Sequence, residues 1–304
     1  MRPTRLATVV AVVLTAVAAV AGCSPAHPVA APPRHVAAAV PHRPAARHAA
    51  AVPRPAHVVV VIFENKAASQ VLGNSRAPYL TALARLGATF SHSYAVTHPS
   101  EPNYLALFSG STQGVTSDRC PVTLPRTDNL GRQLSAAHRT FAGYSEGMPR
   151  PGYTGCTGSN GRYARKHNPW VDFGTVPASA NRTFAQFPAD YATLPDVSFV
   201  VPDMCHDMHD CSVATGDAWA RRYLAPYVRW ARAHNSLLIV TFDEDDGSAG
   251  NRIATFFVGQ HTRKGTYAGR IDHYTVLRTI EAMFGLPALG NARHRSPITG
   301  VWTG

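Results

Sequence analysis

The sequence predicts an α/β domain built on a mainly parallel sheet. Two continuous apolar runs, 57–63 and 236–242, are rich in β-branched residues and have the length of strands buried on both faces. Segments with the apolar spacing of helices alternate with such runs along the chain. The chain has 304 residues, of which 45% are apolar, so it can bury one large core or two small ones.

The first 56 residues are expected to lie outside this domain, which we place at 57–304. Arg2 and Arg5 precede an apolar run at 6–22, which fits a secretory signal better than a membrane span. Residues 20–23, Val-Ala-Gly-Cys, resemble the lipobox of bacterial lipoproteins, so we expect a signal peptide at 1–22 and a lipid-modified Cys23. An ordinary signal peptide cleaved nearby is the alternative. In both cases the protein is exported, either secreted or held as a lipoprotein at the outer face of the cytoplasmic membrane.

Residues 23–56 are predicted to form a disordered tether, because Ala, Pro, Arg and His dominate them and a core cannot be built from that composition. After the tether, each element follows from a local pattern. The helix at 78–86 ends at Gly87, the helix at 273–284 ends at Gly285, and Asp128 is a candidate cap for a helix at 128–138. The other expected helices are 217–234 and one that contains the run 104–108 and has Pro102 in its first turn. The other expected strands are 88–96, 140–144, 197–201 and 253–258.

Two further segments are read from composition. The predicted helix 217–234 carries Trp219, Tyr223, Tyr227 and Trp230 on roughly one face, which we interpret as core packing. The Gly-rich segment 149–181 is poorly patterned and is expected to form a surface loop beside the active site.

Charge and cysteine content restrict the possible partners. The formal net charge is +11, but no acidic residue precedes Glu64, so the signal and tether contribute about half of the excess. Basic runs with interleaved aromatic residues are missing, which argues against nucleic acid, whereas a mildly basic body suits an anionic substrate. We expect a monomer. Four cysteines follow Cys23, and in an exported protein they suggest two disulfides, for which we favour Cys205–Cys211 and Cys120–Cys156. A zinc site is the alternative, but the spacings are not those of a zinc motif.

Chemically useful side chains gather immediately after the predicted strands. Ligands of open α/β sheets bind outside the carboxyl ends of the strands. The residues found there are Glu64 and Asn65 after 57–63, Ser100 after 88–96, Asp203, His206, Asp207, His209 and Asp210 after 197–201, and Asp243 to Asp246 after 236–242. A helix cap or a turn explains any one of these groups, but it does not explain all four together.

Ser100 and the carboxylates predict a particular chemistry. A serine at a strand-to-helix corner meets backbone N–H groups and the positive end of a helix, which is a place to bind and attack a phosphate. The alternative is that Ser100 is only an N-cap. Glu64, Asn65, Asp243 and either Glu244 or Asp245 form a hard-oxygen set for one divalent cation, with Ca²⁺, Mg²⁺ or Mn²⁺ favoured over Zn²⁺. That cation would polarise the phosphoryl group.

Five segments resemble the phosphoesterase family, which joins secreted bacterial acid phosphatases with bacterial phospholipases C. They are Val61-Ile-Phe-Glu-Asn-Lys66, His98-Pro-Ser-Glu-Pro-Asn-Tyr104, Asp207-Met-His-Asp210, Thr241-Phe-Asp-Glu-Asp-Asp-Gly247 and Asp272-His-Tyr274. The resemblance covers roughly 57–288 and implies an alkaline-phosphatase-like fold with three α/β/α layers. It is strongest to the acid phosphatases that also dephosphorylate phosphatidylinositol 3-phosphate.

The resemblance also implies roles for individual residues. Ser100 is similar to the nucleophile that becomes a phosphoserine, Asn103 to a phosphate-contacting Asn, and His273 to a His near the phosphate. Glu64, Asn65, Asp243 and Glu244 would bind the metal, with the choice between Glu244 and Asp245 open. Asp207 and His209 would be ligands or the acid that protonates the leaving group. Lys166 and His167 resemble a motif bordering the substrate site, the alternative being an exposed basic loop.

Two departures narrow the reaction. Related sulfatases carry Arg at the position that Tyr104 holds, which argues against sulfate chemistry. Two-zinc alkaline phosphatases carry His where Glu244 stands, which favours a single metal. The expected function is therefore a metal-dependent acid phosphatase acting on a phosphorylated small molecule or a phosphoinositide. The alternatives are a phospholipase C-type phosphodiesterase and a surface lipoprotein that binds a phosphorylated ligand without turnover.

Overall fold

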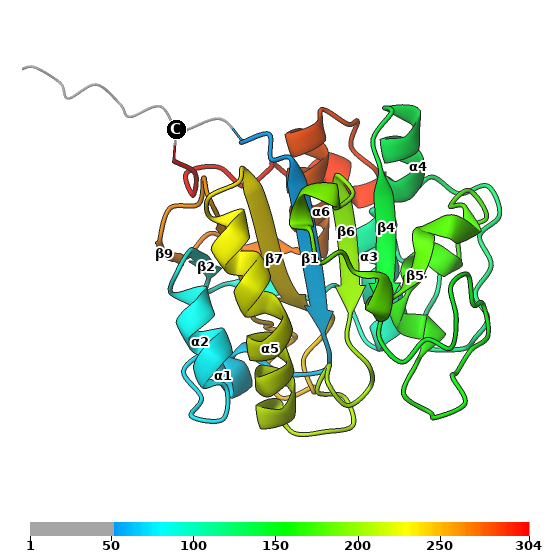
Figure 1. Cartoon of the computed structure of the whole chain (residues 1–304), viewed down its shortest axis with the longest axis horizontal. Helices are drawn as coiled ribbons and strands as arrows, with labels where there is room; N and C mark the ends of the chain where they lie inside the picture. Colours follow the sequence, from blue (N-terminus) through cyan, green and yellow to red (C-terminus); the bar gives the residue numbers. More distant parts are fainter. Residues whose placement is uncertain (1–51, 304) are drawn as a thin grey trace, which may run out of the picture. The chain divides into compact units, whose positions relative to one another are not determined.

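The computed structural model of the protein describes residues 52–303. The predicted signal peptide, Cys23 and most of the tether lie outside the described residues. The centre is an eight-stranded sheet in the order β5-β4-β6-β1-β7-β8-β2-β9 (Figure 1). Its strands are β1 (His57–Phe63), β2 (Ala88–Phe90), β4 (Phe141–Ser145), β5 (Asn181–Thr183), β6 (Val197–Val201), β7 (Ser236–Phe242), β8 (Thr255–Gly259) and β9 (Gly265–Tyr267).

The sheet is mainly parallel, as predicted, and β1 lies at its middle. Val60 of β1 pairs with Phe199 of β6 on one side and with Ile239 of β7 on the other, both in parallel register. β8 is the exception, because it runs antiparallel to β7 and β2. The predicted strand 88–96 is interrupted by a turn and forms two strands, β2 and β3 (Ser93–Tyr94). β3 pairs with β10 (Ile271–Asp272) in a separate two-stranded sheet.

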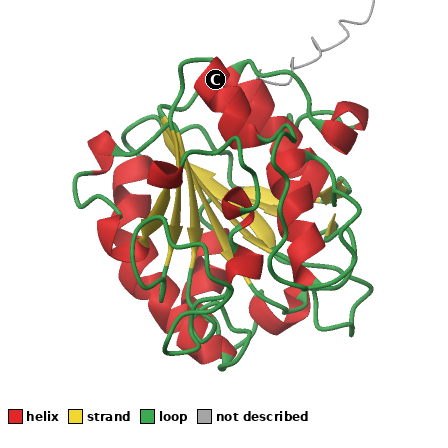
Figure 2. Cartoon of the chain, turned by 90° about the vertical axis from the view of Figure 1, so that its right-hand side faces the viewer, coloured by secondary structure: helices red, strands yellow, loops and turns green. Residues whose placement is uncertain are grey.

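Helices cover both faces of the sheet and make the three layers visible in Figure 2. Alternate residues of β1 point to opposite faces, so each face receives its own apolar set. One face packs against α3 (Ser100–Ser109), α4 (Leu130–Ala136) and α6 (His273–Phe284). The other packs against α1 (Ala68–Val71), α2 (Pro78–Ala84) and α5 (Val213–Ala231). A strand run that is apolar at every position is therefore what this architecture requires.

Two helix starts, those of α4 and α5, differ from the sequence prediction. α3 begins at Ser100, one turn before the helix-like run 104–108, and all of its residues are buried. α4 is capped by the Asn129 side chain, which accepts from Arg132 N, and not by Asp128. α5 begins at Val213 because the Ser212 side chain caps it. For α4 and α5, a side-chain hydrogen bond at the first turn marks the start.

Both favoured disulfides are formed. Cys120 pairs with Cys156, and Cys205 pairs with Cys211. None of the helices within 52–303 combines the length and the apolar character that a membrane crossing needs.

Candidate active site

Three buried carboxylates meet at the carboxyl edge of the sheet. Because β1, β6 and β7 are parallel neighbours, their ends lie side by side. Glu64 follows β1 directly, Asp243 follows β7 directly, and Asp207 lies in the loop after β6. Glu64 N donates to Asp207 O at 2.8 Å, and Asp243 N donates to Phe63 O at 3.0 Å, so backbone hydrogen bonds fix the three segments together.

Ser100 places its hydroxyl group among the acidic side chains. Its Oγ lies 3.2 Å from Glu64 Oε2 and 3.1 Å from Glu244 Oε1. The residue is buried at the first position of α3, and its side chain makes no cap hydrogen bond. The alternative reading as a simple N-cap is therefore wrong. The hydroxyl and the carboxylates come together from segments far apart in the chain.

Glu244 and Asp245, neighbours in the acidic loop after β7, make different contacts. Asp245 accepts hydrogen bonds from the backbone of Gly247, Ala249 and Asn251, so its carboxylate shapes the loop. Glu244 instead faces Ser100, and its Oε2 lies 2.6 Å from Nδ1 of His98. Of the two, Glu244 is the one that the structure places at the centre.

The two predicted asparagines hold the backbone around the centre. Asn103 Oδ1 accepts from Val96 N at 2.9 Å and from Thr97 N at 3.0 Å, and its Nδ2 donates to Thr97 O and Pro99 O. It therefore braces the segment leading to Ser100. Asn65 has a left-handed backbone, with φ of 48°, which lets its N–H donate to Asp243 Oδ1 at 2.9 Å.

His167 lies deeper in the centre than the sequence analysis expected. Its buried ring has Nε2 3.1 Å from Glu64 Oε1 and Nδ1 3.4 Å from Asp207 Oδ2. The ring stacks on Tyr104 at 5.2 Å, and the Tyr104 hydroxyl donates to Glu64 Oε1. His167 is therefore not part of an exposed basic loop. The sequence placed it beside the substrate site, whereas the structure places it between two carboxylates.

Lys166 approaches the centre from a short 3₁₀ turn, η1 (Arg165–His167), and is held by Asp118. Its Nζ lies 2.7 Å from Asp118 Oδ2, while Asp118 Oδ1 accepts from Glu101 N at 3.0 Å. Burial lowers the pKa of Lys166, but the Asp118 hydrogen bond and the charges of Glu64 and Asp243 outweigh it, so the net shift is upward. The ammonium therefore stays charged. Asp118 was not among the predicted site residues, because no local sequence pattern marks it.

Two predicted histidines border the carboxylates. His209 is partly exposed, its backbone N–H donates to Asp207 Oδ1 at 2.8 Å, and its ring lies 6.0 Å from that of His167. His273 is buried, with Nε2 2.6 Å from the backbone oxygen of Asp243, and burial lowers its pKa. His209 thus faces the edge of the centre, whereas His273 lies behind Asp243.

The three central carboxyl groups are buried close together, which makes their ionised forms costly without a cation. Burial raises the pKa of Glu64 and Asp207 well above their usual values, and burial with the neighbouring charge of Glu244 raises the pKa of Asp243 to about 7. Within residues 52–303, Asp207 Oδ2, Asp243 Oδ2 and His167 Nε2 have no hydrogen-bond partner. Ligand atoms of Glu64, His167 and Asp207 lie within 4.8 Å of one another. Such orphaned, buried oxygens beside one imidazole fit a divalent metal ion.

The profile of the phosphoesterase family matches residues 70–287. The chain belongs to the phosphoesterase family. The predicted family is thereby confirmed.

Relatives in the family carry phosphatase names. The chain is 50% identical over 256 residues to a phosphatidylinositol-3-phosphatase of Mycobacterium tuberculosis, covering 84% of this chain and 85% of the relative. It is 34% identical over 226 residues to an acid phosphatase of Aspergillus fumigatus, covering 68% of this chain and 51% of that protein. The chain thus spans about half the length of this fungal relative.

Solved structures show the fold of the family. A protein of the alkaline phosphatase superfamily from Vibrio parahaemolyticus aligns with a TM-score of 0.54 and 12% identity, covering 82% of this chain and 71% of that one. A phosphonate monoester hydrolase from Silicibacter pomeroyi aligns with a TM-score of 0.52 and 11% identity, covering 80% and 76%. The alkaline-phosphatase-like fold implied by the sequence resemblance is confirmed.

Proposed function

We propose that the protein is a metal-dependent acid phosphatase that cleaves phosphate monoesters through a phosphoserine at residue 100, with phosphatidylinositol 3-phosphate among its substrates. One observation carries this proposal: the Ser100 hydroxyl lies between Glu64 and Glu244 at the start of a buried helix, beside Asp243. The names of the relatives support a phosphomonoester substrate. Export and lipid attachment at Cys23 remain part of the proposal on the sequence pattern alone.

Each residue of the site has its own role in the proposed transfer of the phosphoryl group to Ser100. Glu64, Asp207, His167 and Asp243 would hold one divalent cation, which when bound would neutralise the carboxylates and polarise the phosphoryl group. Glu244 accepts the proton of Ser100 as Oγ attacks phosphorus. The backbone N–H groups at the start of α3 and the Lys166 ammonium stabilise the phosphoryl oxygens.

Loss of the leaving group completes the transfer to Ser100, and hydrolysis then returns the enzyme to its starting state. The bond from phosphorus to the leaving oxygen breaks, and His209 at the open edge of the centre donates a proton to that oxygen. Water then gives a proton to His209 and attacks phosphorus, the bond from phosphorus to Ser100 Oγ breaks, and Oγ takes back its proton from Glu244 as inorganic phosphate leaves. Because relatives carry the name acid phosphatase, we expect the rate to fall above neutral pH.

The test uses the purified protein with p-nitrophenyl phosphate and with phosphatidylinositol 3-phosphate. Chelator should abolish turnover, and Mg²⁺, Mn²⁺ or Ca²⁺ should restore it. Ser100→Ala should lower kcat by roughly 1000-fold or more, and the exposed Ser135→Ala should leave it unchanged. Acid quenching during turnover should trap a phosphoryl group on the peptide that holds Ser100. Full activity of Ser100→Ala, or activity unaffected by chelator, would contradict the proposal. Release of phosphocholine from phosphatidylcholine would favour the phosphodiesterase alternative instead.

A further inference from the structure

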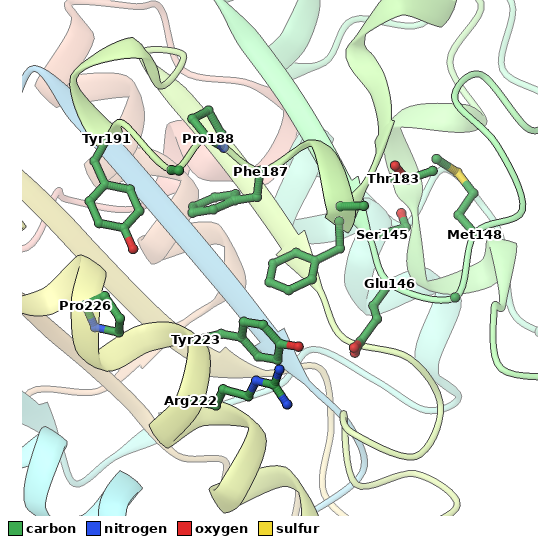
Figure 3. A pocket seen from close by; sticks show the side chains of 14 residues that line it. Ser145, Glu146, Met148, Thr183, Phe187, Pro188, Tyr191, Arg222, Tyr223 and Pro226 are labelled. Carbon is green, nitrogen blue, oxygen red and sulfur yellow. The ribbon is translucent and has the colours of Figure 1, made fainter.

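A cavity of about 550 Å³ opens between α5 and the segment 183–191, on the α5 face of the sheet (Figure 3). Neither Ser100 nor the three central carboxylates line it. Its volume lies within the range of small-molecule sites. The cavity is therefore separate from the centre that holds Ser100.

Aromatic and apolar side chains form most of the wall. They are Met148, Phe184, Phe187, Pro188, Tyr191 and Tyr223. The Phe184 ring lies 5.0 Å from that of Tyr223, and the Tyr191 ring lies 5.3 Å from that of Tyr227. Because these rings pack against further aromatic residues, the wall is preformed. Tyr223 packs against the core, as predicted, but it also lines the cavity.

The cavity runs lengthwise along the sheet. At one end, Phe184 packs on Trp219 at 5.4 Å, and Trp219 packs on Phe63, the last residue of β1. At the other end, Tyr191 packs on Trp230 at 5.7 Å, and Trp230 lies 5.9 Å from His57, the first residue of β1. The Phe184 end therefore points toward the edge of the sheet that carries Ser100, and the Tyr191 end points away from it.

The end of the cavity lined by Glu146 and Arg222, here called its mouth, adjoins the loop that supplies Asp207. Glu146 follows β4 directly and lines the mouth, and its Oε2 lies 2.9 Å from His206 Nδ1 and accepts from Asp203 N at 3.1 Å. Asp203 O in turn accepts from Asp207 N at 2.8 Å. A second link runs from Ser145 in the cavity wall to Asn168, the neighbour of His167. One loop therefore separates the mouth from the centre.

Arg222 supplies a guanidinium at the Glu146 end of the cavity. Glu146 is paired with His206, whereas Arg222 is exposed and makes no ion pair with any residue of 52–303. The guanidinium lies 5.2 Å from the Tyr223 ring, so stacking holds it near the mouth. Figure 3 shows Arg222 and Glu146 together at one end and Tyr191 with Pro188 at the other. A molecule with an anionic group at the Arg222 end and an apolar chain toward Tyr191 would match this lining.

We propose that this cavity binds the acyl chain of an amphipathic phosphate ester whose phosphomonoester is cleaved at Ser100, with Arg222 facing a second anionic group of the same molecule. The inference rests on the proposed function and extends it to the rest of the substrate. A phosphoinositide 3-phosphate supplies all three parts: a phosphomonoester, a phosphodiester and an acyl chain. Phosphodiester recognition is a favoured task for an unpaired guanidinium.

The experiment compares three substrates: p-nitrophenyl phosphate, inositol 1,3-bisphosphate and water-soluble dioctanoyl phosphatidylinositol 3-phosphate. Arg222→Gln should raise KM for both inositol substrates about tenfold and leave p-nitrophenyl phosphate kinetics unchanged. Ala189→Trp, which fills the cavity from its exposed rim, should raise KM for the dioctanoyl lipid alone. Arg221→Gln is the matched control, because Arg221 is exposed on the same helix and does not line the cavity.

Binding separates this inference from the proposed reaction. Calorimetric titration of the dioctanoyl lipid into the Ser100→Ala protein should show affinity that falls about tenfold in Ser100→Ala/Arg222→Gln and in Ser100→Ala/Ala189→Trp. Lipid KM and lipid affinity unchanged by both cavity substitutions would overturn the inference. Failure of the wild-type protein to cleave the lipid, with binding still sensitive to these substitutions, would contradict only the proposed reaction on that lipid.

Discussion

Asp243 is the residue at which the charge of the carboxylate cluster can be measured most directly. It is buried, its Oδ2 has no hydrogen-bond partner within 52–303, and burial together with Glu244 raises its pKa from 3.8 to about 7. A difference of about 3 pKa units corresponds to roughly 4 kcal/mol. Metal-free protein should therefore carry a stability deficit of this order once Asp243 is ionised.

The direction of the pH dependence of stability follows from the pH at which Asp243 releases its proton in the folded and in the unfolded state. As pH rises above 3.8, the carboxyl group ionises in the unfolded chain but stays protonated in the folded protein until about pH 7. Ionisation therefore favours the unfolded state across this window, and the stability of the metal-free protein falls until the folded-state pKa is passed. Between pH 5 and 8 the contribution of Asp243 amounts to about 2.5 kcal/mol. Buried His167 and His273, whose pKa values are lowered, change stability in the opposite direction near pH 6.

A comparison with Asp243→Asn isolates the carboxylate from these histidines. Urea unfolding of chelator-treated wild type and Asp243→Asn at pH 5 and pH 8 gives the stability difference at each pH. That difference should shift by about 2.5 kcal/mol in favour of the variant at pH 8. The exposed Asp128→Asn is the control and should show no shift. Equal differences at the two pH values would refute the reasoning.

Metal addition completes this test. Mn²⁺, Mg²⁺ or Ca²⁺ should raise the stability of the wild type at pH 8, because a cation favours the ionised carboxylates. The Asp243→Asn protein should gain much less. A wild-type stability that none of the three cations changes would contradict a metal site at Glu64 and Asp243.

Two further predictions concern carboxylates outside this cluster. Asp118→Asn should lower kcat/KM for p-nitrophenyl phosphate about tenfold, because it releases Lys166. In a Lys166→Met background, the same substitution should lower kcat/KM no further. Additive losses of kcat/KM in steady-state kinetics would show that Asp118 acts independently of Lys166. Asp217→Ala should lower the free energy of unfolding by about 3 kcal/mol, because it removes the acceptor of two backbone N–H groups in the first turn of α2, at 3.1 and 2.7 Å. Urea unfolding measures this loss, and a cost below about 0.5 kcal/mol, the level expected for Asp128→Ala at an exposed pair, would disprove it.

The strands were the most predictable part of the fold. β1, β6 and β7 have the bounds that their apolar runs predict, because a strand covered on both faces must be apolar throughout. The antiparallel direction of β8 could not be predicted, since a buried run carries no mark of direction. The cap of α4 was misassigned because Asp128 and Asn129 are equally good caps in sequence and only the fold selects between them.

The candidate site was predictable where a residue directly follows a strand. Glu64 and Asp243 stand at such positions, and the parallel sheet brings them together. The contacts of His98, Tyr104 and Asp118 were not foreseen, because their partners lie far away in the chain and come from differently patterned loops. Residues carried by the irregular segment 149–181 could be assigned only a general position beside the substrate.

The burial of α3 on every side has a consequence for how turnover can proceed. A helix enclosed in this way cannot shift without disturbing packing on both its flanks. Its amide hydrogens should therefore exchange with solvent deuterium only when the entire domain opens. Any motion that admits substrate or releases phosphate must then come from the surrounding loops, while the nucleophile stays still.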